Sequence, residues 1–304
     1  MAPSTLLALD IGTHTVLGTV GRADGGRLEL LASRQWFARL GEGVRTSGRL
    51  RPQAVARALE ALREARALAH EHGAEIAAVA TRACRDARNA DEFLGPAMEI
   101  LGVPVEIVSG EREAELTFRG ASSGLAVEGP SLWIDVGGGS TELIEADGAI
   151  PKRAVSTSLG AVALTEAHLR SDPYRQEELD AARDAVRAGL DAVRVPSVPQ
   201  VVGIGGTATT FVAMERRMSR YDGARVHGFR LAADRLASWL ERLAELPLAR
   251  RTAVDGLAAE RAPVIVAGGM VLREVLTRAG AGSLLVSDRG VRHGVLLDRL
   301  LPRG

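Results

Sequence analysis

The stretch LWIDVGGGSTE at residues 132–142 decides the fold class of this chain, because a shorter relative of it, LLALDIGT, occupies residues 6–13. Each copy is an apolar run typical of a β-strand that ends in an aspartate, Asp10 or Asp135, and then enters a glycine-containing turn. Glycine lets backbone N–H groups close around an anion, and a carboxylate beside them can organise a metal ion. The repetition predicts one phosphate held between two related halves of the protein.

The second copy carries the stronger signal. Either copy alone is compatible with a plain β-turn in which the aspartate caps the following backbone and glycine supplies an unusual φ. Three consecutive glycines at 137–139 cost conformational entropy, however, and this favours a close approach to a ligand. Glu142 lies across the turn from Asp135, so the sequence predicts that both carboxylates face one Mg²⁺.

The length and composition of the chain favour two domains. It has 304 residues, of which 46% are hydrophobic and 25% charged, as in ordinary globular proteins with sizeable cores. Turn-forming residues accumulate from Gly120 to Pro130, and we expect the domain boundary there. The predicted domains are residues 1–120 and 121–290, with a C-terminal helix at about 291–304 that packs back on the first.

Strand and helix signals alternate along the chain, as they do in α/β proteins built from crossover units. The first half predicts strands at 5–10, 15–21, 27–37, 76–80 and 103–108, and helices at 54–72, 91–101 and after Ser109. The second half predicts strands ending at Asp135 and near 153–157, 200–204, 263–267 and 283–287, with helices at 173–194, after Thr207, at 270–279 and at the C-terminus. Glycine turns follow four of these strands, and ligands of open α/β sheets gather at that edge.

Charge and composition exclude several classes of function. A formal net charge of zero argues against a partner that is a nucleic-acid polymer, because such binders neutralise phosphates with a basic excess. No run approaches ~18 uninterrupted apolar residues, so no membrane contact is predicted. The one cysteine, Cys84, excludes a disulfide framework and favours a cytoplasmic protein; we interpret it as a small buried residue rather than an activated thiol. The six histidines have no metal-ligand spacing.

Two further clusters leave alternatives open. Glu111, Glu113 and Glu115 open a predicted helix at alternate positions and cannot share one face. Periodicity alone favours a solvated helix start, whereas a place between the two halves favours a carboxylate that holds and deprotonates a water. Arg82 and Arg85 follow a strand, where they either solvate a loop or clamp phosphate oxygens.

These motifs resemble the exopolyphosphatase and guanosine pentaphosphate phosphohydrolase family, Ppx/GppA, in its short two-domain form. The resemblance covers essentially the whole chain, and its most specific part is the run of Asp135 to Glu142 combined with Ser-Gly-x-x-Glu-Ala upstream. The landmarks are residues 10–13, 81–89, 108–114, 134–142, 205–207 and 287–294.

The resemblance implies an α/β fold of two actin-like (ribonuclease H-like) domains with a cleft between them. It also implies a cofactor, Mg²⁺ or another divalent cation, and stepwise release of terminal orthophosphate from inorganic polyphosphate. The alternatives are removal of the 5′-terminal phosphate of guanosine pentaphosphate, a non-catalytic sensor of polyphosphate or guanosine penta/tetraphosphate, and a sugar-kinase-like transferase. The oligomeric state stays open between monomer and homodimer.

The resemblance also assigns roles to positions. Glu113 corresponds to the catalytic base that positions or activates water, and Asp10, Asp135 and Glu142 correspond to ligands of the metal. Phosphate binding falls to Gly12, Thr13, His14, Arg85, Gly137, Gly138, Gly139, Ser140, Gly205, Gly206 and Thr207. Many relatives carry asparagine where this chain has His14, so the contribution of that side chain stays open.

Overall fold

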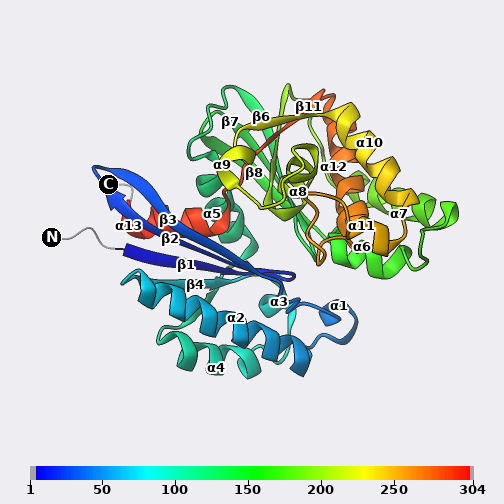
Figure 1. Cartoon of the computed structure of the whole chain (residues 1–304). Coiled ribbons are helices and arrows are strands. Elements are labelled where there is room, and N and C mark those ends of the chain that lie inside the picture. The colour runs from blue at the N-terminus through cyan, green and yellow to red at the C-terminus, as the bar shows by residue number, and fades with distance from the viewer. Residues whose placement is uncertain (1–4, 302–304) are drawn as a thin grey trace. The chain divides into compact units, whose positions relative to one another are not determined.

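The computed structural model describes residues 5–301 and separates into two compact units (Figure 1). The first unit consists of the residues up to Ala121 together with those from Gly290 onward, and the second unit runs from Ser122 to Arg289. The chain therefore leaves the first unit once and returns to it once. No helix among residues 5–301 is long and apolar enough to cross a membrane.

The first unit is built on a five-stranded sheet in the order β3-β2-β1-β4-β5. Strands β1, β2 and β3 form an antiparallel meander, and β4 and β5 extend it in parallel with β1. The bounds are β1 Thr5–Ile11, β2 Val16–Asp24, β3 Arg27–Trp36, β4 Glu75–Ala80 and β5 Val105–Ile107. The helices are α1 Val44–Ser47, α2 Pro52–Glu71, α3 Arg82–Asp86, α4 Asp91–Leu101, α5 Gly110–Ser122 and α13 Val291–Leu300.

Strand β1 is apolar from Leu6 to Leu9 because both faces of this sheet are covered. Leu7 and Leu9 belong to a core with α2 and α4, whereas Leu6 and Ala8 belong to a second core with α5 and α13 (Figure 1). Period-two alternation therefore sends neighbouring side chains of one strand into two different cores. The polar Asp10 near the end of this apolar strand is thus an exception to its pattern.

The second unit has a six-stranded sheet in the order β10-β11-β9-β6-β7-β8. Its strands are β6 Pro130–Val136, β7 Thr141–Asp147, β8 Ile150–Thr157, β9 Gln200–Ile204, β10 Phe229–Ala232 and β11 Ser283–Val286. Its helices are α6 Ala161–His168, α7 Gln176–Asp191, α8 Gly205–Glu215, α9 Gly223–Val226, α10 Ala233–Glu245, α11 Leu248–Arg251 and α12 Ile265–Ala279. Their apolar faces form one core with the sheet.

The two sheets repeat one plan. In each, an antiparallel meander (β1-β2-β3 or β6-β7-β8) is extended from its first strand by parallel strands, β4 and β5 or β9 and β11, and only β10 has no counterpart. Asp10 and Asp135 each occupy the next-to-last position of the first strand of their meander. The carboxyl ends of parallel strands form the edge at which open α/β sheets bind ligands.

Several predicted elements differ from the structure. The strand predicted at 263–267 is wrong, because α12 begins at Ile265 and the apolar run leads into a buried part of this helix. A short apolar run does not distinguish a buried helix from a strand. Gly269 lies inside this helix, where a Cβ would lie 2.5 Å from atoms of Leu240 and Phe211. The helix predicted at 173–194 is the shorter α7, and α6 and α10 were not predicted.

Candidate active site

The turn after β1 has a defined hydrogen-bond pattern. The Gly12 N–H donates to the Thr15 carbonyl at 2.9 Å, and the Thr13 carbonyl accepts from the Gly41 N–H at 2.9 Å. A Cβ on Gly12 would lie 3.2 Å from the Thr15 oxygen, so this backbone is closely folded. The Thr13 N–H donates no hydrogen bond within residues 5–301 and remains available to a ligand.

The turn after β6 repeats this pattern. The Gly137 N–H donates to the Ser140 carbonyl at 2.9 Å, and no partner among the described residues accepts from the N–H groups of Gly138 and Gly139. Successive unbonded N–H groups in a glycine turn form a concave site for an anion. The two turns therefore present similar backbone donors, one in each unit.

The glycine run also packs against the backbone before α6, which the sequence interpretation did not include. The Gly138 carbonyl accepts from Val162 N–H at 2.9 Å, at the start of α6. A Cβ on Gly160 would lie 2.3 Å from the Gly138 oxygen, so the backbones before α6 and in the turn touch directly. Close packing of backbone, in addition to room for a ligand, thus explains glycine in this region.

Glu113 and Arg85 form an ion pair in the first unit. The Arg85 Nη1 lies 3.0 Å from Glu113 Oε2 and also donates to the Val108 carbonyl at 2.8 Å. The Glu113 side chain is only 13% exposed, whereas Glu111 and Glu115 of the same helix are exposed. Of the three alternating glutamates, the middle one therefore faces inward, against the solvated helix start that periodicity favoured.

The start of α5 agrees with the predicted cap. The Arg112 N–H donates to Ser109 Oγ at 3.2 Å. Hydrogen bonds from its own backbone and from Ser109 lower the pKa of Glu111, with a smaller contribution from Arg85. Glu111 thus stabilises the start of α5, whereas Glu113 faces inward.

Asp10 has a strongly perturbed carboxyl group. Its pKa is raised to about 7, mainly by burial and then by the negative charge of Glu113, while Arg292 of α13 acts in the opposite direction. Arg292 also donates to Thr19 Oγ1 at 2.7 Å, which fixes it beside β2. Arg292 lies in the landmark 287–294, but the sequence assigned it no role, because only the fold brings α13 beside Asp10.

Asp135 and Glu142 face each other across the hairpin of the second unit. They are direct partners in the antiparallel register of β6 and β7, so their side chains lie on the same face of the sheet. Glu142 is buried, and its Oε1 accepts from Ser156 Oγ at 2.9 Å. The pairing expected from the sequence is therefore present in the strand register.

The Gly205-Gly206-Thr207 loop lies against this pair. Gly205 has φ of 72° and a Cβ there would lie 2.2 Å from Asp135 Oδ1, so only glycine fits. Thr207 Oγ1 donates to the Val136 carbonyl at 2.9 Å. The glycine pair thus starts α8 in direct contact with the end of β6.

Arg261 is a residue of this region that the sequence did not reveal. A Cβ on Gly206 would lie 1.9 Å from Arg261 Nη1, so the guanidinium rests on the glycine backbone. Burial lowers the pKa of Arg261 to about 10, and Tyr221, Asp135 and Glu260 offset part of that effect. A loop arginine before α12 has no local pattern that marks it, and only the fold brings it to Asp135.

His14 and Cys84 have packing roles. The His14 ring meets Phe37 edge to face, with centroids 5.7 Å apart and an interplanar angle of 78°. Cys84 is buried, and burial raises the pKa of its thiol to about 12, so it is not an activated nucleophile. The interpretation of Cys84 as a small core residue is confirmed.

The predicted residues fall into two groups. Asp10, Gly12, Thr13, His14, Arg85 and Glu113 belong to the first unit, and Asp135, Gly137, Gly138, Gly139, Ser140, Glu142, Gly205, Gly206 and Thr207 belong to the second. Within residues 5–301 no group of three or more His, Cys, Asp or Glu side chains is arranged as a metal site. Mg²⁺ commonly keeps several waters and binds one or two carboxylates plus substrate phosphates, so the in-register pair Asp135 and Glu142 suits it.

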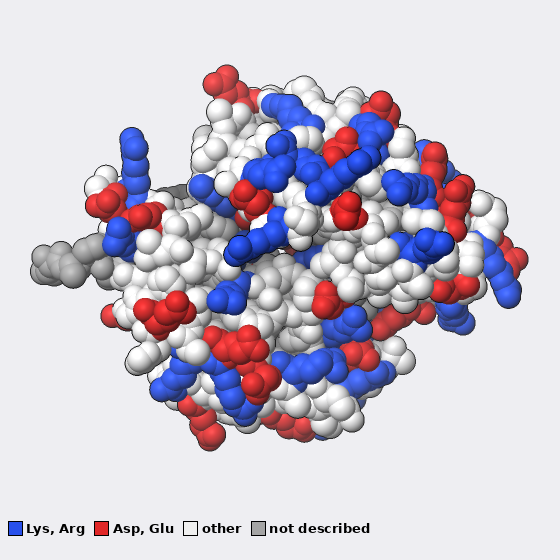
Figure 2. Space-filling view, in the orientation of Figure 1, with Lys and Arg blue, Asp and Glu red and all other residues white. Residues whose placement is uncertain are grey.

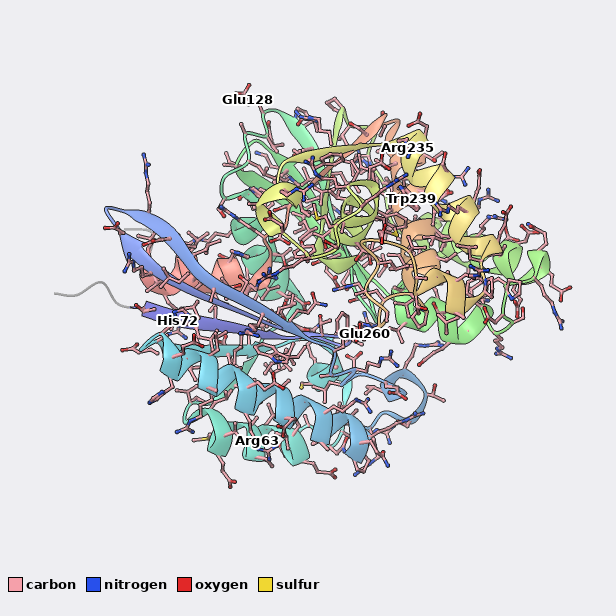
Figure 3. All side chains as sticks on the ribbon, viewed as in Figure 1. Arg63, His72, Glu128, Arg235, Trp239 and Glu260 are labelled. Carbon is pink, nitrogen blue, oxygen red and sulfur yellow. The ribbon has the colours of Figure 1, made fainter. Side chains whose placement is uncertain are left out.

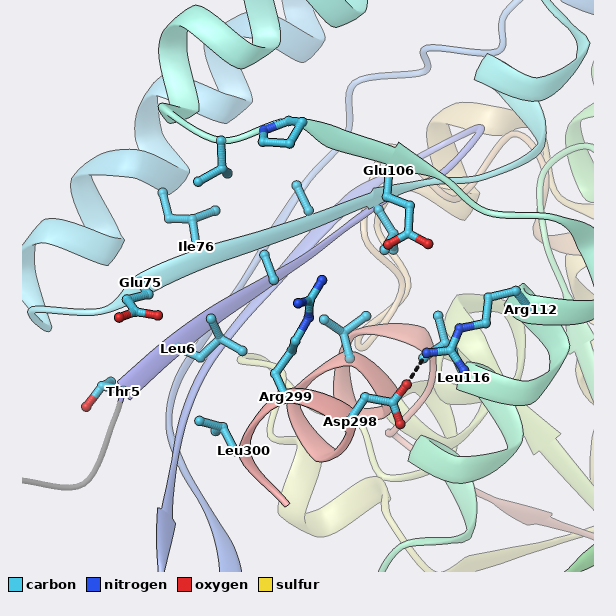
Figure 4. A pocket seen from close by; sticks show the side chains of 16 residues that line it. Thr5, Leu6, Glu75, Ile76, Glu106, Arg112, Leu116, Asp298, Arg299 and Leu300 are labelled. Carbon is cyan, nitrogen blue, oxygen red and sulfur yellow. Dashed lines mark hydrogen bonds and ion pairs between the residues drawn. The ribbon is translucent and has the colours of Figure 1, made fainter. Parts of the chain in front are cut away.

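A separate pocket of the first unit lies at the other end of the strands (Figure 4). Its lining includes Thr5 and Leu6 at the start of β1 and Glu75 at the start of β4. On its far side, Arg112 of α5 donates to Asp298 of α13 (Figure 4). Because Asp10 lies at the opposite end of β1, this pocket is not part of the candidate site.

A duplicated sheet with Asp-Gly turns at its ligand-binding edge defines an actin-like protein of the phosphate-handling class. Residues 19–303 match the model of the Ppx/GppA phosphatase family, and the chain belongs to that family. Exopolyphosphatase 2 of Mycobacterium tuberculosis is 34% identical to it over 98% of this chain and 99% of the relative. The resemblance stated from the motifs is confirmed.

Solved structures agree with the fold. The Ppx/GppA family member of Aquifex aeolicus superposes with a TM-score of 0.84 and 32% identity, over 98% of each chain. An exopolyphosphatase of Cytophaga hutchinsonii gives a TM-score of 0.90 at 24% identity, again over 98% of each chain, and supports the fold alone. The predicted α/β class with two actin-like domains is confirmed.

Proposed function

We propose that the protein is an exopolyphosphatase, which hydrolyses the terminal phosphoanhydride bond of inorganic polyphosphate and releases orthophosphate. The observation that carries the proposal is the pair of matching turns with unbonded N–H groups, accompanied by the inward-facing Glu113. The name of the M. tuberculosis relative, similar over nearly the whole chain, supports the choice of substrate. Removal of the 5′-phosphate of guanosine pentaphosphate is the second candidate, because the family name includes such enzymes.

Glu113 is proposed as the base that orients the attacking water. A carboxylate can accept a proton from water only if it is ionised, and the Arg85 guanidinium 3.0 Å away stabilises that form. Arg85 in turn is suited to bind oxygens of the phosphoryl group, so it would link the base to the phosphate. In this arrangement the protein contributes mainly positioning and charge, as expected for phosphoryl transfer.

The turns and the acidic residues are proposed to bind the transferred group and its metal. The N–H groups of Thr13, Gly138 and Gly139 would donate to phosphate oxygens, where charge develops in the transition state. Asp10 in the first unit, and the pair Asp135 and Glu142 in the second, are proposed as ligands for divalent cations such as Mg²⁺, which would neutralise phosphate charge. The remaining predicted residues, His14, Gly137, Ser140, Gly205, Gly206 and Thr207, would shape the site around these donors.

The direct test is orthophosphate release by the purified protein. We expect release from tripolyphosphate and from long polyphosphate in the presence of Mg²⁺, and its loss in EDTA. Guanosine pentaphosphate is assayed in parallel, and a kcat/KM higher than that for polyphosphate would transfer the assignment to that substrate. Ligand-induced thermal stabilisation without orthophosphate release, under several divalent metals, would instead identify a sensor.

Arg261 is proposed to contribute to substrate binding through its place on Gly206. The Gly206→Ala substitution adds a methyl group where Arg261 Nη1 now lies, so the flexible guanidinium must move. We expect little change in Tm but a fall in kcat/KM of about tenfold, similar to that of Arg261→Ala. Because both changes remove the same interaction, the double variant should be no worse than either single one. Fully additive losses would show that Gly206 and Arg261 act separately.

A further inference from the structure

Five arginines gather in one short segment of the second unit. We call Arg216, Arg217, Arg220, Arg225 and Arg230 the arginine cluster; all five side chains are exposed. None of them forms an ion pair within residues 5–301, although the Arg216 guanidinium lies over the Phe229 ring, 5.4 Å from its centroid. Basic side chains gather over the part of the second unit that contains α9 (Figure 2).

The carboxylates within and beside this segment are already engaged. Glu215 accepts from Arg235 at 3.1 Å and from Trp239 Nε1 at 2.7 Å, and these two residues lie next to each other on α10 (Figure 3). Asp222 caps α9 by accepting from the Ala224 N–H at 3.0 Å. Asp288 accepts from the Tyr221 hydroxyl. Glu215 also interacts electrostatically with Arg217, but no carboxylate among residues 5–301 forms an ion pair with the cluster.

The segment that carries the cluster leads away from the candidate site along α8 and then returns to the same edge of the sheet. Helix α8 starts at Gly205, on the loop against Asp135, and its 11 residues span about 16 Å before the cluster begins. The chain then returns to the end of the sheet. A Cβ on Gly223 would lie 2.3 Å from Asp288, and Asp288 is the second residue after β11. Strands β6, β9 and β11 are parallel, so Asp288 follows the same sheet edge as Asp135.

Two arginines of the cluster lie next to this contact in the chain. Arg220 and Arg225 flank the part of the segment, residues 221–223, that contacts Asp288. Tyr221 of this part also interacts electrostatically with Arg261, which rests on Gly206. Within the second unit, the middle of the segment that carries the arginine cluster thus contacts Asp288 at the sheet edge that also carries Asp135.

We propose that the arginine cluster is a second binding site, which holds phosphates of a long polyphosphate chain beyond the terminal one. The proposal rests on the proposed function and adds a preference for long chains to it. Guanidinium groups bind phosphate oxygens in a bidentate manner, and a chain with charge on every repeating unit engages several of them at once. In a protein of zero net charge, such a local cluster supplies the attraction.

The test compares long and short substrates. The double variant Arg220→Gln/Arg225→Gln is expected to raise KM for long polyphosphate about tenfold. KM for tripolyphosphate, and kcat for both substrates, should stay within about twofold of the wild-type values, because the terminal site is intact. The KM for long polyphosphate in the variant should also depend less on salt. Equal changes for both substrates, or no change for either, would overturn the proposal.

The matched control is Arg170→Gln/Arg194→Gln. Both are exposed arginines of the second unit outside the cluster, so the control has the same net charge as the test variant. We expect it to leave KM for long polyphosphate unchanged. A rise equal to that of Arg220→Gln/Arg225→Gln would show that total charge, and not the cluster, attracts the chain.

A binding measurement separates this proposal from the proposed function. Equilibrium binding of labelled long polyphosphate, measured in EDTA, should weaken in Arg220→Gln/Arg225→Gln whether or not the wild-type protein releases orthophosphate. If the wild-type protein releases no orthophosphate but its binding of polyphosphate still weakens in Arg220→Gln/Arg225→Gln, only the proposed hydrolase activity is rejected. If it releases orthophosphate and the substitutions do not weaken binding, only the second binding site is rejected. Binding of a single-stranded RNA that is as tight, and as sensitive to the substitutions, would identify a nucleic-acid surface and overturn the proposal.

Discussion

Replacing Glu113 by glutamine is expected to lower kcat for orthophosphate release by about 10²–10⁴-fold, the contribution of a positioned general base. Glutamine keeps the size of the side chain but cannot accept a proton from water. The loss should appear in kcat more than in KM, because the interaction with the water proton is made in the transition state. The measurement is initial rate against substrate concentration, with Mg²⁺ at saturation.

Glu115→Gln provides the control for this prediction. Glu115 lies in the same helix, is exposed and pairs with Arg112 at 2.7 Å, so its substitution tests the effect of charge near α5 without touching the inward face. Its kcat should equal that of the wild-type protein. Thermal melting should show that Glu113→Gln is folded, with a Tm change of a few degrees at most for one lost ion pair. Near-wild-type turnover by folded Glu113→Gln would exclude Glu113 as the base.

Asp10→Asn is expected to abolish most activity and to change the pH dependence of stability. The pKa of Asp10 is about 7 in the metal-free folded protein, against about 4 for an exposed aspartate. Between these values the folded state holds a proton that the unfolded state has lost, so the free energy of unfolding falls as pH rises from about 4 to about 7. Asparagine does not titrate, so the free energy of unfolding of the variant does not fall in this way between pH 4 and pH 7.

Melting curves at pH 5 and pH 8 in EDTA measure the effect. The Tm of Asp10→Asn minus that of the wild-type protein should be larger at pH 8 than at pH 5, by about 4 °C or more. Mg²⁺ should stabilise the wild-type protein at pH 8 more than the variant, because a bound cation favours the ionised carboxyl group. Asp24→Asn, at an exposed hairpin position, should show neither effect. A Tm difference between Asp10→Asn and the wild-type protein that does not vary with pH would contradict the raised pKa of Asp10.

The sequence predicted the parts of the structure that depend on local pattern. The meanders, α2 and the βα alternation follow from period-two strands, Gly turns and a proline at the helix start, and these elements agree with the structure. The in-register pair Asp135 and Glu142 followed from counting across a short turn. The prediction at 263–267 failed because the first part of α12, residues 265–272, is buried on all sides and therefore shows no polar face and no period.

Residues brought together by tertiary structure were harder to predict. The inward orientation of Glu113 depends on Arg85, 28 positions earlier, and the helix alone favoured the opposite conclusion. Arg292 acts on Asp10 from a landmark to which the sequence assigned no role, and Arg261 acts on Asp135 from a loop that carries no motif. The glycines in the sequence predicted that the turns would offer backbone N–H groups to an anion. The packing of Gly160 on Gly138 could be seen only in the structure.

The order in which the chain visits its two units has a consequence for synthesis on the ribosome. The second unit is continuous from Ser122 to Arg289 and can fold as soon as it has emerged. The first unit must wait, because Val291, Val295 and Leu296 of α13 cover the face of β1 that carries Leu6 and Ala8. Until these last residues are made, that apolar face is exposed to solvent, and the nascent chain is most open to aggregation and chaperone binding over this interval.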